Sequence, residues 1–221
     1  MLRECQGVME FFDLADVPRV PWKNGGGSTQ ELVCWPPGAG MDDFEWRVSV
    51  ATIATPGPFS AFPGIDRQIM LLQGDGVLLQ GESGRWEHAL DQPWQPLAFS
   101  GDEPVDCRML GGTSTDFNLM QRRGAWSGKL QVLHGVPPPA AGGAGLCMVL
   151  QGTWQWRGDD TDGASERVLK AGQGVWWMDA NADGAEVASG LAPWDAHCET
   201  QNASSALVLA WVTLHPAGSS H

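Results

Sequence analysis

The chain of 221 residues contains no tyrosine, few cations and no long apolar segment. The low cation count and the short apolar runs exclude several classes of protein. Only 13 residues are Lys or Arg against 26 Asp or Glu, so the formal net charge is −13. A surface of this charge repels phosphate backbones and anionic lipid headgroups, which argues against nucleic-acid or membrane partners. The longest apolar runs, such as residues 69–72, are much too short to span a bilayer.

The five cysteines lack the spacing of a disulfide framework or a zinc site. They lie at positions 5, 34, 107, 147 and 198, an odd number without a C-x-x-C pair, and we interpret them as reduced thiols. The N-terminal residues carry scattered charges without an apolar core, so no secretory signal is expected. Together these observations predict a soluble cytoplasmic protein.

The histidines also lack the spacing that the metal site of a metal-dependent β-barrel needs. The five histidines include no H-x-H pair. The nearest cluster, His197-Cys198-Glu199, consists of adjacent residues that would point to opposite faces of a strand. We therefore expect no catalytic metal and no other cofactor. A G-x-S-x-G motif is absent as well, so a serine nucleophile of that type is not expected.

What the chain does contain is 29 glycines and 15 prolines, which fits many short strands joined by turns. An internal repeat organises these strands. The segments Ile69–Leu79 and Cys147–Trp156 both consist of an apolar strand, a Gln-Gly turn that resembles a hairpin, and a second strand. Leu90 and Leu169 follow them 79 residues apart, within one residue of the 78-residue offset between the turn glycines Gly74 and Gly152.

The repeat predicts an all-β protein made of two jelly-roll, or cupin, barrel lobes in one chain. We place the first lobe at residues 1–125 and the second at residues 126–221, with the Pro/Gly-rich segment 137–145 leading into the strands of the second lobe. The second lobe lacks the polar motifs of the first. It is therefore expected to serve packing or dimerisation, and a homodimer is one expected assembly.

Polar side chains that a plain barrel would not need gather in four segments of the first lobe. In one of them Lys23 and Asn24 precede three consecutive glycines, which let a ligand approach the backbone closely. In a second, strict alternation places Arg47 and Ser49 on one face of a strand. The other two segments, residues 58–67 and 116–123, supply Asp66, Arg67, Asp116 and Asn118.

These segments predict a small polar pocket in the first lobe. The ligand-binding candidates are Lys23, Asn24, Arg47, Ser49, Arg67, Asp116 and Asn118. Arginine and lysine with hydroxyl and amide donors suit a carboxylate, because the guanidinium fork matches two oxygens. Arg47 and Lys23 would hold the acidic group, while Asp116 would accept a hydrogen bond from a ligand N–H or fix Arg47.

The same segments resemble the HutD/Ves family. The resemblance rests on W-K-N-G-G-G-x-T-x-E at Trp22–Glu31, W-R-x-S at Trp46–Ser49, G-P-F-S-x-F-P-G-x-D-R at Gly57–Arg67 and D-F-N-x-M-x-R-R at Asp116–Arg123. It implies a two-lobed cupin fold without metal-binding histidines and with a polar pocket in one barrel. It also implies a role in modulating histidine utilisation by binding a pathway intermediate, for which formate, urocanate, formiminoglutamate and formylglutamate are the candidates.

Two other functions stay open on the sequence. A metal-independent isomerase, lyase or hydrolase would use Asp116 or Asp66 as a general base, with a pKa raised by a dry barrel interior. A purely structural interaction partner would bind no metabolite, and its polar segments would not converge on one cavity. The leading hypothesis is a non-enzymatic, regulatory protein that binds a small carboxylate.

Overall fold

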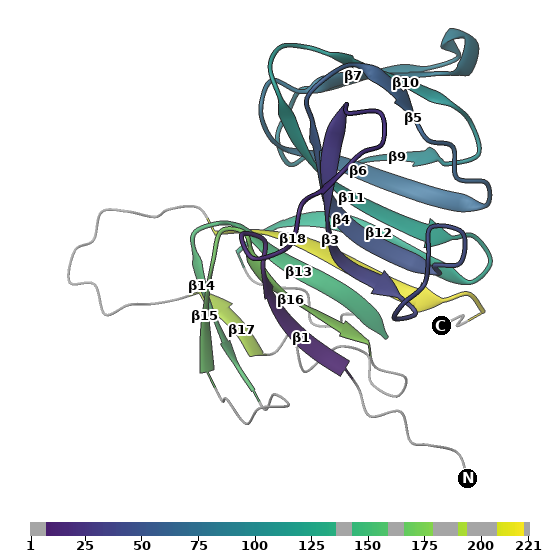
Figure 1. Cartoon of the computed structure of the whole chain (residues 1–221). Coiled ribbons are helices and arrows are strands. Elements are labelled where there is room, and N and C mark those ends of the chain that lie inside the picture. Colours follow the sequence, from purple (N-terminus) through teal and green to yellow (C-terminus); the bar gives the residue numbers. More distant parts are fainter. Residues whose placement is uncertain (1–7, 136–142, 159–165, 179–189, 194–206, 219–221) are drawn as a thin grey trace. The chain divides into compact units, whose positions relative to one another are not determined.

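The computed structural model describes residues 8–135, 143–158, 166–178, 190–193 and 207–218. Strands dominate this part of the chain, and they divide between two compact units (Figure 1). The first unit consists of residues 17–127. The second unit consists of the described residues of 1–16 and 128–221. The all-β, two-lobed architecture expected from the internal repeat is therefore confirmed.

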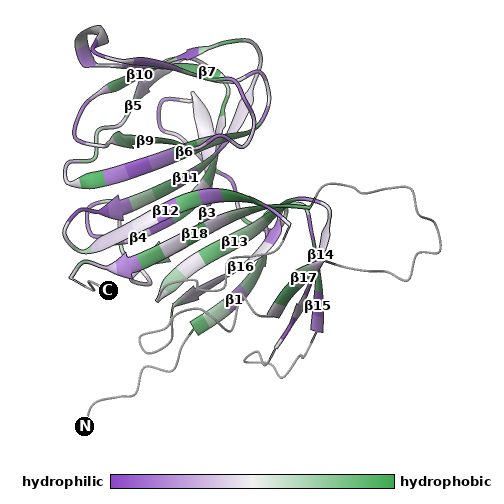
Figure 2. Ribbon diagram, turned by 180° about the vertical axis from the view of Figure 1, so that it is seen from behind, coloured by the Kyte–Doolittle hydropathy of each residue, from purple (hydrophilic) through white to green (hydrophobic). Residues whose placement is uncertain are grey.

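The first unit is built from two antiparallel sheets. Its large sheet has the order β2 (Val20–Pro21), β3 (Gly27–Trp35), β4 (Trp46–Ile53), β11 (Ser114–Arg122), β6 (Ile65–Gln73), β9 (Leu97–Ser100). Its small sheet has the order β5 (Gly57–Phe59), β10 (Val105–Met109), β7 (Val77–Gly81), β8 (Glu87–Leu90), and η1 (Glu82–Gly84) is a 3-10 turn between β7 and β8. Apolar residues of β7 and β10 (Figure 2) pack with Ile53, Ile69 and Leu71 of the large sheet in one buried cluster.

The second unit also contains two antiparallel sheets within its described residues. One has the order β1 (Val8–Asp13), β16 (Gln173–Met178), β13 (Ala144–Gln151), β18 (Val208–Pro216), β12 (Trp126–His134). The other has the order β15 (Glu166–Lys170), β14 (Thr153–Arg157), β17 (Leu191–Pro193). Tryptophan fills this core: Trp154, Trp156, Trp177 and Trp211 are all buried in one cluster. Bulky indoles thus occupy the interior of the second unit.

The two units repeat the same strand pairings. In the first unit β6 pairs with β9 and β7 with β8, and in the second β13 pairs with β16 and β14 with β15. The expected hairpins are wrong in one respect, because β6 and β7 belong to different sheets, as do β13 and β14. Gly74 and Gly152, with φ of 103° and 87°, lie in these connections, where the chain leaves one sheet for the other.

The N-terminal strand departs from the sequence division at residue 125. β1 pairs antiparallel with β16, from Val8 opposite Met178 to Asp13 opposite Gln173, so it belongs to the second unit (Figure 1). Most of the expected connection at 137–145 lies outside the described residues. None of the helices in the described ranges has the length and hydropathy needed to cross a membrane.

Candidate ligand-binding pocket

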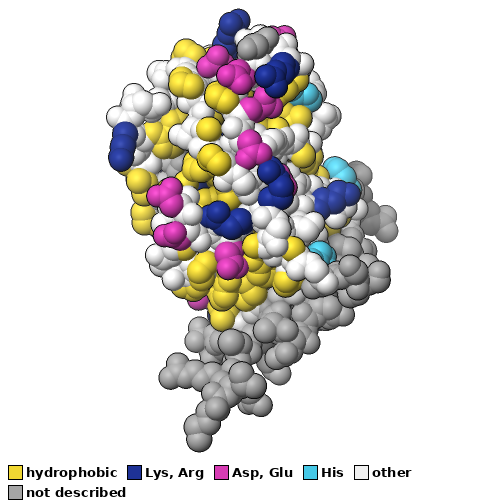
Figure 3. All heavy atoms as spheres, turned by 90° about the vertical axis from the view of Figure 1, so that its right-hand side faces the viewer, with side chains coloured by type: hydrophobic (Ala, Val, Ile, Leu, Met, Phe, Trp, Pro, Cys, Tyr) yellow, Lys and Arg dark blue, Asp and Glu magenta, His cyan; other side chains and the backbone are white. Residues whose placement is uncertain are grey.

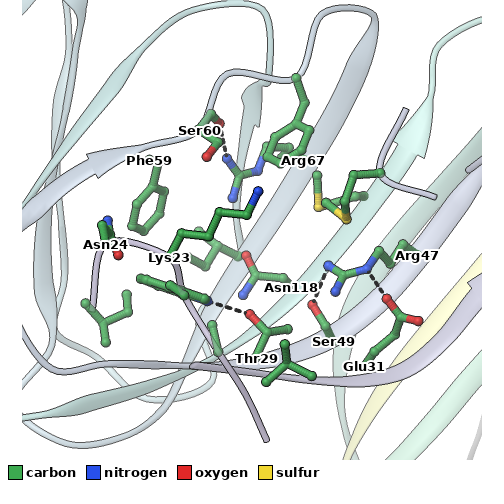
Figure 4. A pocket seen from close by; sticks show the side chains of 18 of the residues that line it. Lys23, Asn24, Thr29, Glu31, Arg47, Ser49, Phe59, Ser60, Arg67 and Asn118 are labelled. Atoms are coloured by element: carbon green, nitrogen blue, oxygen red, sulfur yellow. Dashed lines mark hydrogen bonds and ion pairs between the residues drawn. The ribbon is translucent and has the colours of Figure 1, made fainter. Parts of the chain in front are cut away.

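A cavity of about 750 Å³ lies in the first unit, along the inner face of the large sheet (Figure 4). Its lining comes from β4, β6 and β11 together with the segments around β2, β3 and β5. Six of the seven candidate residues line it: Lys23, Asn24, Arg47, Ser49, Arg67 and Asn118. The four polar segments of the sequence therefore converge on one cavity, as a binding site requires.

Strand alternation and register bring the central residues together. Arg47 and Ser49 point to the cavity from β4, as the alternation of that strand predicts. Asn118 of β11 lies directly opposite Ser49, and Arg67 of β6 lies opposite Met120 of β11. Three neighbouring strands thus present two guanidinium groups, a hydroxyl and an amide to the same space.

The glycine-rich segment forms a tight turn at the edge of the cavity. The Trp22 N–H donates to the Gly27 carbonyl at 2.9 Å, and the Gly25 N–H donates to the Trp22 carbonyl at 3.0 Å. Gly27 has to be glycine, because a Cβ there would lie 2.2 Å from the Thr52 carbonyl oxygen. This turn places Lys23 at the cavity, and Figure 4 shows its side chain pointing toward the Arg67 guanidinium.

Arg47 is held by Glu31 and not by Asp116. Its Nε donates to Glu31 Oε2 at 2.6 Å, and its Nη1 donates to Ser49 Oγ at 3.2 Å. Glu31 lies in the glycine-rich motif, yet sequence reasoning did not select it as a pocket residue. The missing information is the pairing of β3 with β4, which sets Glu31 opposite Ser49.

Arg67 has a very different environment. It is 8% exposed and is surrounded by three aromatic rings, whose centroids lie 4.9 Å (Phe99), 5.4 Å (Phe59) and 5.5 Å (Phe62) from its guanidinium carbon. Its Nη1 donates to the Ser60 carbonyl at 3.4 Å, while its Nε is buried and has no hydrogen-bond partner among the described residues. Burial, and then repulsion by Arg47, lower the pKa of Arg67 to about 10.

No carboxylate within the described part of the chain forms an ion pair with Arg67. Of the described lining residues only Glu31 is acidic, and Arg47 already binds it. The cavity therefore contains three basic side chains against one carboxylate. An isolated buried charge is unfavourable unless something pairs with it, so this arrangement can accept an anion.

Asp116 is the candidate that does not line the cavity. It is fully buried on β11, where its strand neighbours are Ala51 of β4 and Leu71 of β6. Neither carboxyl oxygen has a hydrogen-bond partner in the described ranges. Burial raises the pKa of Asp116 to about 7, and burial together with the nearby Asp116 charge raises the pKa of the Cys107 thiol to about 12.

Groups of metal-binding side chains are absent from the described ranges, and the cluster at His197, Cys198 and Glu199 lies outside them. The absence of a functional metal therefore stays a prediction. Elemental analysis of protein purified without chelator should find zinc, iron, manganese and nickel well below one equivalent, because the cavity offers three cations and one carboxylate as its charged groups. One equivalent of any of these metals would contradict it.

Comparison with known proteins first defines the fold class. A cupin conserved barrel domain protein from Leptotrichia buccalis superimposes with a TM-score of 0.52 at 10% identity, covering 92% of this chain and 95% of that one. The chain thus has a cupin-type fold with two β-barrel lobes and a basic cavity in one of them.

Closer relatives then define the family. The HutD family model matches residues 14–191, and the chain belongs to the HutD family. Protein Ves from Cronobacter sakazakii is 36% identical over 174 residues, which are 78% of this chain and 89% of that protein. The structure of HutD from Pseudomonas fluorescens SBW25, in a formate condition, superimposes with a TM-score of 0.70 at 29% identity, covering 96% of this chain and 100% of that one. The resemblance found in the sequence motifs is confirmed.

Proposed function

We propose that this protein binds a small carboxylate in the cavity of the first unit, and that it modulates histidine utilisation by sensing a pathway intermediate. The observation that carries the proposal is Arg67, a buried guanidinium with no carboxylate partner in the described part of the chain. A ligand carboxylate supplies the missing counter-charge and can accept two parallel hydrogen bonds from the guanidinium. Lys23, which points toward Arg67, adds a second cation at the same place.

The rest of the cavity suits a ligand with a second polar group. Ser49 and Asn118 offer a hydroxyl and an amide between the Arg67 end and the Arg47–Glu31 pair (Figure 4). A volume of about 750 Å³ is in the range of cavities that hold molecules much larger than formate. Formate would occupy only the Arg67 end, whereas urocanate, formiminoglutamate or formylglutamate would extend toward Asn118. The formate condition of the Pseudomonas fluorescens HutD structure supports a small carboxylate as the ligand class.

Binding is better supported than the enzymatic alternative. A general base must come within hydrogen-bond reach of the proton that it removes. Asp116 is fully buried behind the cavity lining, and Asp66 is half-exposed and bound to Arg123 at 2.6 Å. Neither carboxyl lines the cavity. The purely structural alternative is disfavoured as well. It predicts that the four polar segments do not meet, whereas residues of all four line the cavity.

A thermal-shift experiment tests the proposal. One of the four carboxylates should raise the melting temperature, because a ligand at ~100 times its dissociation constant adds about 2.7 kcal/mol of stability. For a chain of this size that corresponds to a shift of several degrees. Arg157→Ala, at an exposed ion pair of the second unit, should leave the shift unchanged. No shift with any of the four at millimolar concentration would contradict the proposal, and a new product in the NMR spectrum would favour an enzyme instead.

We further propose that the regulatory signal passes to a protein partner in the cytoplasm, with the protein acting as a monomer or homodimer. Direct contact with DNA or with a membrane is disfavoured by the net charge of −13. On the face shown in Figure 3, basic and acidic side chains are interspersed and do not form one basic patch. This distribution supports the same exclusion for that face.

A further inference from the structure

Asp116 is a buried acid that does not line the cavity and takes no part in the proposed ligand contacts. Its side chain has no exposed surface, and neither of its carboxyl oxygens is hydrogen-bonded in the described part of the chain. Buried polar groups are nearly always paired, since an unpaired carboxylate in an apolar setting is strongly unfavourable. An apolar residue would fold into this position without that penalty. The unpaired acid therefore calls for a functional explanation.

The surroundings of Asp116 connect it to the cavity. Asn118 lies two residues further along β11 on the same inner face, and it lines the cavity. Its Nδ2 donates to the backbone carbonyl of Asp116 at 3.2 Å. On the neighbouring strand β4, Ala51 lies directly opposite Asp116 and also lines the cavity. The acid is thus next to the lining of the cavity but is not itself in contact with the space that a ligand would fill.

The groups that face Asp116 come from three neighbouring strands. On β4 the inner face continues from Ala51 to Ser49 and Arg47, and on β6 it continues from Leu71 to Ile69 and Arg67. From β10, the Cys107 thiol packs in the cluster that contains Leu71. The other charged groups of the cavity are Lys23 and Glu31. None of these side chains donates a hydrogen bond to the Asp116 carboxyl.

We propose that Asp116 couples occupancy of the cavity to a proton, so that it takes up a proton from solvent when an anion enters and releases it when the anion leaves. The inference rests on the proposed function, because it requires an anion in the cavity. An ionised Asp116 and a ligand carboxylate would be two like charges in one poorly screened interior. Protonation of Asp116 removes that repulsion, and no covalent change in the ligand is involved.

The direction of the pH dependence follows from the raised pKa of Asp116, about 7 in the empty protein. Below that pH the carboxyl is neutral with or without ligand, so anion affinity does not change with pH. Above that pH the Asp116 carboxyl is ionised in the empty protein but stays protonated in the complex. Binding then requires proton uptake, so the affinity for the anion falls as pH rises. The total loss is tenfold for each pKa unit by which the anion raises the pKa of Asp116. Arg67, with a pKa of about 10, and the Cys107 thiol, with a pKa of about 12, keep their charge states between pH 6 and pH 8.5.

Calorimetric titration of the full chain with formate and with urocanate at pH 6.0, 7.0, 8.0 and 8.5 tests this inference. Wild-type affinity should fall by about tenfold between pH 6.0 and pH 8.5. Titrations at pH 8.0 in buffers of different ionisation heat should show net proton uptake on binding. Asp116→Asn should bind formate with the same affinity at every pH and take up no proton, because neither the amide nor formate titrates in this range. Asp66→Asn is the matched control, since Asp66 lies on the other face of β6, and it should behave as wild type.

Each outcome decides a separate point. Equal wild-type affinity at pH 6.0 and pH 8.5, or no proton uptake at pH 8.0, overturns the role of Asp116 while leaving the binding site intact. An Asp116→Asn variant that keeps the wild-type pH dependence overturns it as well. If this variant does not fold, the proton count on the wild type decides alone. No binding of either carboxylate at pH 6.0 overturns the proposed function and the inference together.

Discussion

Replacing Arg67 with methionine is expected to weaken carboxylate binding by at least about thirtyfold, the largest effect of any single change in the cavity. Removing one member of a buried, hydrogen-bonded charge pair typically costs 2–5 kcal/mol or more, which corresponds to roughly thirty- to several-thousandfold in affinity. Methionine keeps an unbranched, apolar stem that can pack against Phe59, Phe62 and Phe99. The loss should therefore come from the missing charge and not from a collapsed site.

The empty Arg67→Met protein should unfold at the same or a higher denaturant concentration than wild type. The reason is that the substitution removes a buried cation whose Nε has no hydrogen-bond partner in the part of the chain that the structure describes. Arg123→Met is the control, because Arg123 is half-exposed in the same unit and forms ion pairs with Asp66 and Asp102. It should keep wild-type affinity in a formate titration. Wild-type affinity in Arg67→Met would show that the anion site lies elsewhere.

Asp116→Asn is expected to become increasingly more stable than wild type as pH rises from 5 to 8. The folded-state pKa of Asp116, about 7, lies above its unfolded value of 3.8, so the folded state holds the proton more tightly. The contribution of Asp116 to wild-type stability therefore decreases between pH 3.8 and about 7, by about 1.4 kcal/mol per pH unit, and is constant above that pH. The stability advantage of the variant should grow by roughly 3 kcal/mol between pH 5 and pH 8.

Urea unfolding at pH 5, 6, 7 and 8, followed by tryptophan fluorescence, measures this difference. Asp66→Asn again serves as control, and its free energy of unfolding relative to wild type should hardly change over the same range. A constant difference between Asp116→Asn and wild type would mean that the carboxyl does not titrate in this window. The raised pKa of Asp116, and with it the proton coupling, would then be wrong.

The internal repeat made the fold predictable because its landmarks are local. Leu90 pairs with Val77 at the start of β7, and Leu169 pairs with Trp154 near the start of β14, so the two landmarks lie in equivalent strand pairs whose registers differ by two residues. The N-terminal strand carries no such landmark. Its pairing with β16 depends on which exposed sheet edge is free after the rest has folded, and local sequence does not encode that choice.

The candidate site was predictable for a similar reason, and only to the same extent. Alternation along β4 is a local property, and it placed Arg47 and Ser49 on one face correctly. The partner of Arg47 depends on the register of β3 against β4, where a bulge lies between Glu31 and Val33. The rings around Arg67 come from the β5 region and β9, which no spacing rule connects. Asp116 shares the inner face of β11 with Asn118, but whether other side chains cover it is decided by packing.

The pairing of β1 with β16 has a consequence for synthesis of the protein. Asp13 accepts a hydrogen bond from Gln173 Nε2 at 2.7 Å, although 160 residues of sequence separate the two. The residues of the whole first unit, 17–127, come between β1 and β16 in the sequence. On the ribosome, all residues of the cavity-bearing unit have been synthesised once residue 127 emerges. The backbone edges of β1 stay unpaired until β16 has been translated. Contacts of such long range form late and leave strand edges available to other chains. A truncation that removes Val8–Asp13 should therefore impair the second unit, whereas the residues that line the cavity, from Val20 to Met120, lie outside the deleted segment.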